Sequence, residues 1–424
     1  MFVFDNMPAP FIGLGGLEAD LSDEEKTVQG ATHRFAKEVM RPIGAALDKM
    51  TPEEVIAPNS PLFDFLRQIK DTGLLDLNAI AGMSAQEKAR MMPIIFEELG
   101  WGDCGLTIAA LGTRLPAFAA AMSGDPELVE EFGSLPGCWI GTQPDRGSDI
   151  TDFDASELHP NTRHGRGNLI ARMVGDEVVL NGQTSAWVSA GPIAQCAYVL
   201  CQCDYGEGLW NDRGGLHLIT LLVPFGKGVS KGKPLDKLGQ RALPQGEIFF
   251  NEVVLPKKYV VSQKGAAAGA CFGALTFANM KMGLIFTGVA RAAYEHALAY
   301  AHERHQGGTA IINHQSVRAR VFDMWRKVEA ARALARRVTD YNYSSSHGAH
   351  MLASMTSKTY VTQTALEVAN EALQTFGGNG LTKEYPVEKI MRDARAALIE
   401  DGENNLLSLK GGTWLSKWYQ NNHT

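Results

Sequence analysis

The chain has 424 residues, of which 45% are hydrophobic and 21% are charged, as expected for one large or two to three modest globular domains. Its formal net charge of -7 and the lack of a sustained Lys/Arg block argue against a nucleic-acid partner. Residues 1–6 do not begin a signal-peptide pattern, and no segment nears about 18 uninterrupted apolar residues. We therefore expect a cytoplasmic protein that does not enter a membrane.

The first third of the chain has helical patterning. Ser22 and Glu25 form a capping-box pattern, and the apolar residues that follow lie on one helical face. Helical spacing continues over residues 61–69 and 85–99, and small residues over 104–111 predict a tightly packed helix. We expect an all-α domain over residues 1–135.

The composition changes at Pro136, after which short β-rich runs separated by turn signals predict strands. The runs cover residues 177–180, 186–188, 197–200, 216–223 and 248–255. Asn181-Gly182 is a strong hairpin signal. These features predict a small antiparallel β domain over residues 136–260.

Helical patterning resumes from about Thr276, after an Ala/Gly-rich connection at residues 265–273. We assign residues 261–424 to a C-terminal helical bundle domain. No internal repeat is visible, so the order of the chain is α, then β, then α.

One helix of this domain runs into glycines near the end of the chain. Its apolar residues recur at helical spacing up to Leu373, and the helix must end at Gly377. A second helix restarts after Pro386 and carries the acidic pair Glu400-Asp401 to a helix breaker, Gly402. A carboxylate fixed beside glycine at a helix end can approach a bound ligand.

Residues 373–403 resemble the C-terminal signature of the acyl-CoA dehydrogenase flavoprotein family almost residue for residue. The resemblance implies an α+β fold with an N-terminal all-α domain, a middle antiparallel β-barrel domain and a C-terminal four-helix bundle. It also implies FAD-dependent conversion of an acyl-CoA thioester to the 2-enoyl-CoA. Asp401 stands eight residues after Asp393, where the family carries its catalytic base, although the usual base in the medium- and short-chain members is Glu.

Two segments of the β domain also resemble family motifs. Residues 139–149 resemble a Thr-Glu-Pro-x-Ala-Gly-Ser-Asp motif that meets the flavin ring, with Gln143 and Arg146 in place of Glu and Ala. Residues 181–189 resemble a strand whose Trp, here Trp187, packs on the isoalloxazine. A flat aromatic side chain suits that task because it buries a large area with few rotamers to freeze.

Residues 288–308 resemble the family helix that ends in Arg-x-x-Phe-Gly, with Gly307 in place of Phe. In the family this Arg, here Arg304, faces the FAD pyrophosphate across a dimer interface, where a bidentate donor is well suited. The segment at Gln374 contacts the FAD of a neighbouring subunit. The resemblance thus implies a homodimer or homotetramer.

Carried over residue by residue, the resemblance assigns two sets of ligands. The FAD set is Trp139, Gly141, Thr142, Gly147, Ser148, Trp187, Ser189, Arg304, Gln306, Gln315, Gln374, Gly377, Gly378, Glu403 and Asn405. The acyl-CoA set is Ser148, Asn279, Asp401 and Gly402. We expect no metal site, because His302 and His305 are three residues apart rather than four.

Several departures from the family pattern leave alternatives open. Asn279 replaces an Arg of the straight-chain members, residues 150–170 are longer and more polar, and Glu403 replaces a Thr near the FAD phosphates. An acid at residue 403 would repel pyrophosphate unless it is turned away or paired. An Asp base occurs in branches that handle cyclic acyl-CoAs and in nitroalkane oxidases.

Three hypotheses follow. The first is a dehydrogenase for a cyclic, branched or otherwise unusual acyl-CoA that passes electrons to an electron-transfer flavoprotein. The second is a nitroalkane-oxidase-like flavin oxidase. The third is an FAD-poor partner subunit of a hetero-oligomeric acyl-CoA dehydrogenase.

Overall fold

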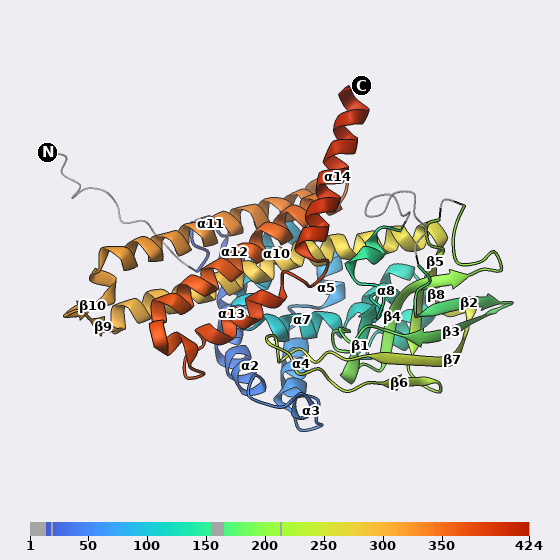
Figure 1. Cartoon of the computed structure of the whole chain (residues 1–424), viewed down its shortest axis with the longest axis horizontal. Coiled ribbons are helices and arrows are strands. Elements are labelled where there is room, and N and C mark those ends of the chain that lie inside the picture. Colours follow the sequence, from blue (N-terminus) through green and yellow to red (C-terminus); the bar gives the residue numbers. More distant parts are fainter. Residues whose placement is uncertain (1–13, 18–19, 154–164, 213, 424) are drawn as a thin grey trace.

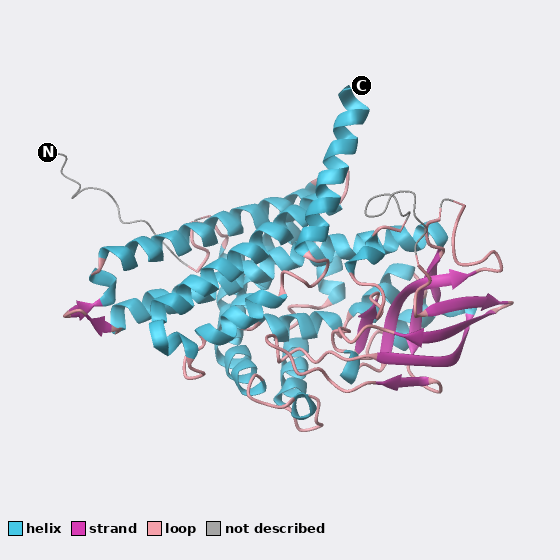
Figure 2. Ribbon diagram, viewed as in Figure 1, coloured by secondary structure: helices cyan, strands magenta, loops and turns pink. Residues whose placement is uncertain are grey.

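The computed structural model describes residues 14–17, 20–153, 165–212 and 214–423. Helices make up both ends of the described chain, and a β-sheet lies between them at one end of an elongated body (Figures 1 and 2). Residues 1–6 and residues 154–164 of the long polar segment, both considered above, lie outside the described residues.

The first part of the chain is helical, as predicted. Its helices are α1 (Asp23–Phe35), α2 (Arg41–Leu47), α3 (Pro52–Val55), α4 (Pro61–Asp71), α5 (Leu77–Gly82), α6 (Ala85–Gly102), α7 (Cys104–Gly112), α8 (Leu115–Ser123) and α9 (Pro126–Phe132). The capping box is confirmed, because Ser22 Oγ accepts from Glu25 N (3.2 Å) and Glu25 Oε2 accepts from Ser22 N (2.8 Å).

The middle part forms an open, mainly antiparallel sheet. Its strands are β1 (Gly137–Ile140), β2 (Ile170–Val174), β3 (Glu177–Gln183), β4 (Cys196–Asp204), β5 (Leu218–Pro224), β6 (Val229–Lys231), β7 (Ile248–Pro256) and β8 (Val260–Gln263). Their order is β6-β7-β3-β2-β4-β5-β8, and both β1 and β2 pair with β4 in parallel. The α+β class is confirmed, but the described strands do not close into a barrel, since the short edge strands β6 and β8 do not pair.

Two local predictions in the sheet were wrong. The Asn181-Gly182 pair lies inside β3, where Gly182 has a φ of +119° and a Cβ would lie 2.0 Å from the carbonyl oxygen of Asn168. The glycine therefore permits a bulge against β7 rather than a hairpin. Residues 186–188 form a turn rather than a strand, because the side chain of Thr184 replaces the next ladder bond by accepting from Ile248 N (2.9 Å).

The remaining chain is a helical bundle with one small hairpin. Its elements are α10 (Lys264–Glu303), β9 (His305–Gln306), β10 (Thr309–Ala310), α11 (Gln315–Ser344), α12 (Met351–Phe376), α13 (Val387–Ala396) and α14 (Asn404–His423). The predicted Ala/Gly connection at residues 265–273 belongs to α10. Ala267, Cys271 and Leu275 recur every four residues and are buried against the β domain, so packing overrides the low helix propensity of glycine.

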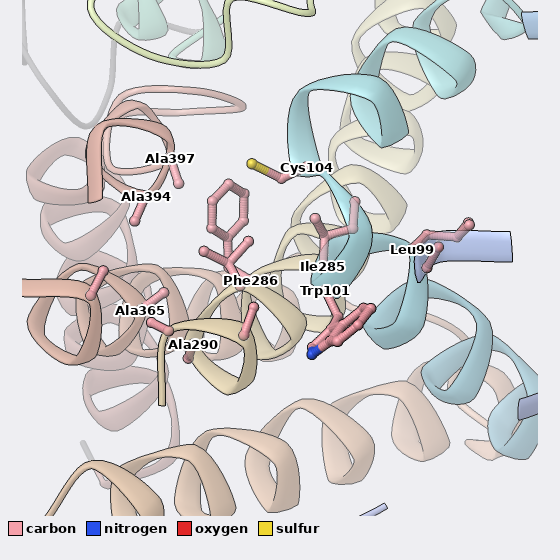
Figure 3. Packing of buried hydrophobic residues seen from close by; sticks show 14 of the residues in the cluster. Leu99, Trp101, Cys104, Ile285, Phe286, Ala290, Ala365, Ala394 and Ala397 are labelled. Carbon is pink, nitrogen blue, oxygen red and sulfur yellow. The ribbon is translucent and has the colours of Figure 1, made fainter. Parts of the chain in front are cut away.

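Helices from both ends of the chain share one hydrophobic core. The Phe286 ring of α10 lies between Cys104 of α7 on one side and Ala394 and Ala397, at the end of α13, on the other (Figure 3). A buried ion cluster joins α10 to α6 of the first part of the chain, because Arg291 of α10 bonds to both Glu97 (2.8 Å) and Glu98 (2.9 Å) of α6. The first and last parts of the chain therefore form a single packed unit.

Two helical stretches, Cys104–Ser123 and Lys264–Glu303, are long and apolar enough to cross a membrane by length and composition. In the most apolar 18-residue window of each stretch, 67% of the first and 56% of the second is buried inside the protein. This burial is what core helices of a packed protein show, and it explains their apolar composition.

Candidate active site

Asp401 lies in a strained turn between α13 and α14. Its φ is +50°, a left-handed conformation that residues other than glycine rarely adopt, and Gly402 follows with a φ of +101°. The φ of Gly402 favours glycine, and a Cβ there would also lie 2.9 Å from the Leu407 side chain. Backbone strain of this kind is often kept at functional sites, where the surrounding structure holds it.

Two elements hold the turn from outside. Asn279 of α10, which is 0% exposed, donates from Nδ2 to the carbonyl oxygen of Asp401 (2.8 Å). Ser148, at the start of a short 3-10 helix in the β domain (Ser148–Thr151), accepts at Oγ from the backbone N–H of Glu403 (3.0 Å). The structure thus brings together Ser148, Asn279 and Asp401, three of the predicted substrate ligands.

A third contact comes from Lys358 of α12, which is 0% exposed. Its ammonium donates to the carbonyl oxygen of Gly402 (2.7 Å) and to Oδ1 of Asn404 (2.7 Å). Asn404 in turn donates to Thr362 Oγ1 (3.1 Å), one turn further along α12. The backbone that carries Asp401 is therefore fixed by three separate elements.

The electrostatics of the turn favour a base that can hold a proton. Burial raises the pKa of Asp401, while the positive charges of Lys358 and Lys281 oppose this rise. Burial, with the charge of Asp401, raises the pKa of the neighbouring Glu400 to about 8. Burial lowers the pKa of Lys358 to about 8, and the charge of Asp401 is the largest effect that opposes it. A carboxyl with a raised pKa beside cations is typical of general acid–base sites.

The carboxylate of Glu403 points toward the first turn of α14, the helix that follows it. Its Oε2 accepts from Leu406 N (3.0 Å), so the carboxylate caps the first turn of α14, and its Oε1 accepts from Asn405 Nδ2 (2.8 Å). The repulsion of pyrophosphate considered above is therefore reduced, because the charge is paired at a helix N-terminus.

An exposed aromatic ring lies on the β-domain side. The indole of Trp187 is 62% exposed, in the turn that follows β3. Beside it, the hydroxyls of Thr142 and Ser185 are 2.6 Å apart, and Ser185 Oγ accepts from Trp187 N (3.3 Å). Ser189 Oγ accepts from Gln245 Nε2 (3.1 Å). A flat ring left open next to hydroxyl groups is suited to a planar ligand.

The predicted flavin loop starts from β1. Trp139 is in β1, and Gly141 and Thr142 follow it directly. Gly147 N donates to Asp149 Oδ1 (2.8 Å), which shapes the loop ahead of Ser148.

The two residues that depart from the family motif have structural contacts. Gln143 is buried and accepts at Oε1 from Leu169 N (2.8 Å), while the guanidinium of Arg146 donates to the carbonyl oxygen of Gly165. These contacts hold the loop on the sheet.

A second group of predicted FAD ligands lies elsewhere. Arg304 and Gln306 are exposed at the β9–β10 hairpin, and Gln315 starts α11 nearby. Gln374, Gly377 and Gly378 are exposed around the end of α12, where Gly377 has a φ of +58° as its predicted place at the helix end requires. Along α10, Asn279 and the last helical residue, Glu303, are separated by about 36 Å at 1.5 Å per residue, and Arg304 follows directly. One chain therefore carries two separate groups of site residues (Figure 1).

Buried polar atoms without hydrogen-bond partners indicate whether a ligand fits the first group of site residues, which surrounds Asp401 and Trp187. Among the described residues, the buried Oδ1 of Asn279 and the buried Nε1 of Trp139 have no hydrogen-bond partner. An unsatisfied buried polar group costs roughly 1–3 kcal/mol, and a bound molecule with matching hydrogen-bond groups would relieve that cost at these two atoms. Together with the open Trp187 ring, they fit a flavin and an acyl thioester.

The contact of Lys358 with this turn was not predicted from the sequence. The apolar residues of α12 that face the core include Val361, Ala365 and Val368, and Lys358 falls on the same face one turn earlier. A lysine on the buried face of an otherwise apolar helix was the available signal, because a buried ammonium requires acceptors nearby.

Comparison with known proteins finds relatives in sequence and in fold. A family model described as "Acyl-CoA dehydrogenase, C-terminal domain" matches residues 270–411. Benzylmalonyl-CoA dehydrogenase of Aromatoleum aromaticum is 27% identical over 401 residues, which cover 93% of this chain and 98% of that protein. Cyclohex-1-ene-1-carbonyl-CoA dehydrogenase of Syntrophus aciditrophicus is 27% identical over 327 residues, covering 75% of this chain and 74% of that protein.

A solved glutaryl-CoA dehydrogenase of Mycobacterium smegmatis in complex with FADH2 shares the fold, with a TM-score of 0.77 and 21% identity over 94% of this chain and 95% of that chain. Fold, site and matched region together define an oxidoreductase of the flavin-dependent class. The chain is thus similar to acyl-CoA dehydrogenases in the sequence of residues 270–411, in relatives that cover most of its length, and in fold.

Proposed function

We propose that this chain removes the α-proton of an acyl-CoA thioester through Asp401, with loss of the β-hydrogen as hydride, to form the 2-enoyl-CoA. The observation that carries the proposal is the Asp401 turn, which Asn279, Ser148 and Lys358 hold where the bundle meets the β domain. The oxidoreductase class and the FAD cofactor come with the family.

The chemistry needs a base, donors to the carbonyl and a hydride acceptor. Asp401 supplies the base, since its raised pKa suits it to accept a carbon-bound proton. The backbone N–H beside Asp401 would hold the thioester oxygen, which becomes more negative as the proton leaves. FAD, when bound, supplies the hydride acceptor over the β-carbon. Trp187 and the hydroxyls of Thr142 and Ser189 would orient the flavin ring.

A cyclic or branched acyl group is the substrate class that this site supports best. Asp is one methylene shorter than Glu, so the base reaches less far from its backbone. Asn279 replaces a bulkier Arg and leaves a buried acceptor, Oδ1, unused. Two relatives named for ring-bearing CoA thioesters, cyclohex-1-ene-1-carbonyl-CoA and benzylmalonyl-CoA dehydrogenases, support the same class.

The second group of site residues supports a shared site between two copies of the chain. Arg304 and Gln374 are exposed far from Asp401, so each FAD would meet Asp401 of one copy and Arg304 of another. We therefore propose a homodimer or homotetramer in the cytoplasm, with an electron-transfer flavoprotein as acceptor.

The test is an absorbance spectrum of the purified protein, followed by anaerobic titration with straight-chain, branched and cyclic acyl-CoAs. We expect a yellow protein whose oxidised flavin band bleaches most rapidly with a cyclic or branched thioester. A yellow protein that no thioester bleaches and that consumes oxygen with a nitroalkane would instead indicate an oxidase. A colourless protein that does not take up added FAD would indicate a partner subunit.

A further inference from the structure

Lys358 lies on the buried face of α12. Among the described contacts, it is the lysine of that helix that bonds to the turn of the proposed base. Its ammonium donates to the backbone oxygen of Gly402 and the side chain of Asn404, so it binds both sides of Glu403. A buried ammonium without acceptors would be strongly destabilising, and these acceptors belong to the turn rather than to α12. The geometry therefore couples the position of α12 to the position of the base.

The backbone conformation of the turn requires contacts that keep it in place. A left-handed residue other than glycine costs of order 1–3 kcal/mol and persists only where its surroundings fix it. Asn279 fixes the carbonyl of Asp401 from one side, and Lys358 fixes the carbonyl of Gly402 next to it. A short Asp side chain has little freedom to correct a displaced backbone, so its reach depends on both contacts.

The charges around the turn come from several elements. Lys358 on α12 and Lys281 on α10 both oppose the rise in the pKa of Asp401, and Lys358 is the stronger of the two. On the turn itself Glu400 and Glu403 act on Lys358 together with Asp401. Lys237 of the β domain acts mainly on Glu400. Lys358 thus differs from the other cations because it combines charge with two hydrogen bonds to the turn.

We propose that Lys358 is a positioning residue for the base: it holds the Asp401–Asn404 turn in its left-handed form and keeps the Asp401 carboxylate ready to accept a proton. This inference rests on the proposed function. It goes beyond it by assigning the orientation and ionisation of the base to a residue that does not touch the acyl group.

The test compares holoprotein of the wild type with Lys358→Met, Lys358→Arg and Lys281→Met. Anaerobic reduction of the flavin by the best thioester is followed by stopped flow across pH. Lys358→Met should raise the pH at which the rate falls off on the acid side by about one unit, because a charge that favours the Asp401 carboxylate is lost. It should also lower the limiting rate about tenfold or more, because the base is misplaced. Lys281→Met removes a charge without these two bonds and should shift that pH with a smaller fall in limiting rate.

A second readout needs no hydride transfer. A 3-oxoacyl thioester has an acidic α-proton, and its enolate absorbs in the near ultraviolet, so the pH at which the bound thioester ionises reports the base directly. This pH should rise in Lys358→Met and stay nearer the wild type in Lys358→Arg, which keeps the charge.

The outcomes separate the two proposals. A wild type that no thioester reduces overturns the proposed function, and this inference with it. A wild type that is reduced, with Lys358→Met within about twofold of it in rate and unshifted in pH, overturns the inference alone. If Lys358→Met does not fold, an unchanged limiting rate in Lys358→Arg, where the planar guanidinium cannot reproduce both bonds, overturns it as well.

Discussion

Asn279 and Asp401 are 122 residues apart in sequence, yet the amide of Asn279 donates to the backbone oxygen of Asp401 at 2.8 Å. The long helix α10 thereby orients the turn of the proposed base, near the other end of the chain. Because the donor must be the amide nitrogen, the remaining Oδ1 is left as an acceptor without a partner among the described residues. One buried side chain thus holds the backbone of the proposed base and leaves an acceptor beside it.

Replacing Asn279 with Ala should loosen the turn. The loss of one buried hydrogen bond is expected to lower the free energy of unfolding by about 1–3 kcal/mol. It should also slow flavin reduction by roughly tenfold, as a misplaced base does. The matched control is Thr287→Val, which removes another buried α10 hydrogen bond, from Thr287 Oγ1 to Gly283 O. Equal loss of rate in both variants would argue against a specific role for Asn279.

Replacing Asp401 with Asn should remove the base and leave the flavin bound. General base catalysis contributes about 10²–10⁴-fold, so flavin reduction by the thioester should slow by at least that lower factor. Stopped-flow reduction and the flavin-to-protein absorbance ratio measure the two effects. Glu400→Gln is the control. If it loses activity while Asp401→Asn keeps it, Glu400 is the base.

Glu400 predicts a pH dependence of stability. Burial raises its pKa to about 8, so between about pH 4.3, the ordinary glutamate pKa, and pH 8 the folded chain binds a proton that the unfolded chain has released. Stability attributable to this group therefore falls as pH rises through that window. In Glu400→Gln the gain in thermal midpoint over the wild type should be larger at pH 8 than at pH 5. A gain that is equal at both pH values would contradict the prediction, and Glu384→Gln at an exposed position controls for lost charge.

Trp187 should be covered when FAD binds. Its indole is exposed, so Trp187→Phe should change the thermal midpoint of the apoprotein little. Tryptophan fluorescence of the wild-type apoprotein should be quenched on addition of FAD, and Trp187→Phe should lose a large part of that quench. Trp418, which is 59% exposed on α14, provides the control, because Trp418→Phe should keep the quench. The opposite pattern would place the flavin elsewhere.

A mixing experiment tests the shared site. Asp401→Asn and Arg304→Ala should each be poorly active alone. Reassembled together, the hybrid dimer should regain activity, because one of its two sites combines Asp401 of one copy with Arg304 of the other. Mixing Asp401→Asn with Asn279→Ala, whose changes fall in the same group, is the control and should not restore a complete site. No recovery in the first mixture would mean that the site is not shared between copies.

Local signals made much of the fold predictable. Ser22 and Glu25 cap α1 as their spacing indicates, α12 ends at Gly377, and α13 begins after Pro386. These features depend on neighbours within a few residues, so sequence spacing contains the necessary information. The break at Gly402 was expected as well, but α13 ends at Ala396, so the acidic pair lies in the turn after the helix rather than at its end.

Contacts between distant residues limited the rest. The glycines of residues 265–273 are helical because Ala267 and Cys271 pack on the β domain, and no local pattern records that surface. Lys358 was missed because its acceptors lie 44 and 46 residues away. Trp187 was expected in a strand, and its turn depends on the bond between Thr184 and Ile248, 64 residues apart.

The length of α10 has a consequence for how cofactor sites communicate. The helix runs from Lys264 to Glu303 and carries Asn279 in its first half and Arg304 at its far end. In a dimer with shared sites, each α10 would contribute to two active sites at once, with Asn279 in one and Arg304 in the other, and a shift of the helix along its axis would reach both. Release of one FAD would then weaken the hold on the other, so the two losses would be cooperative rather than independent.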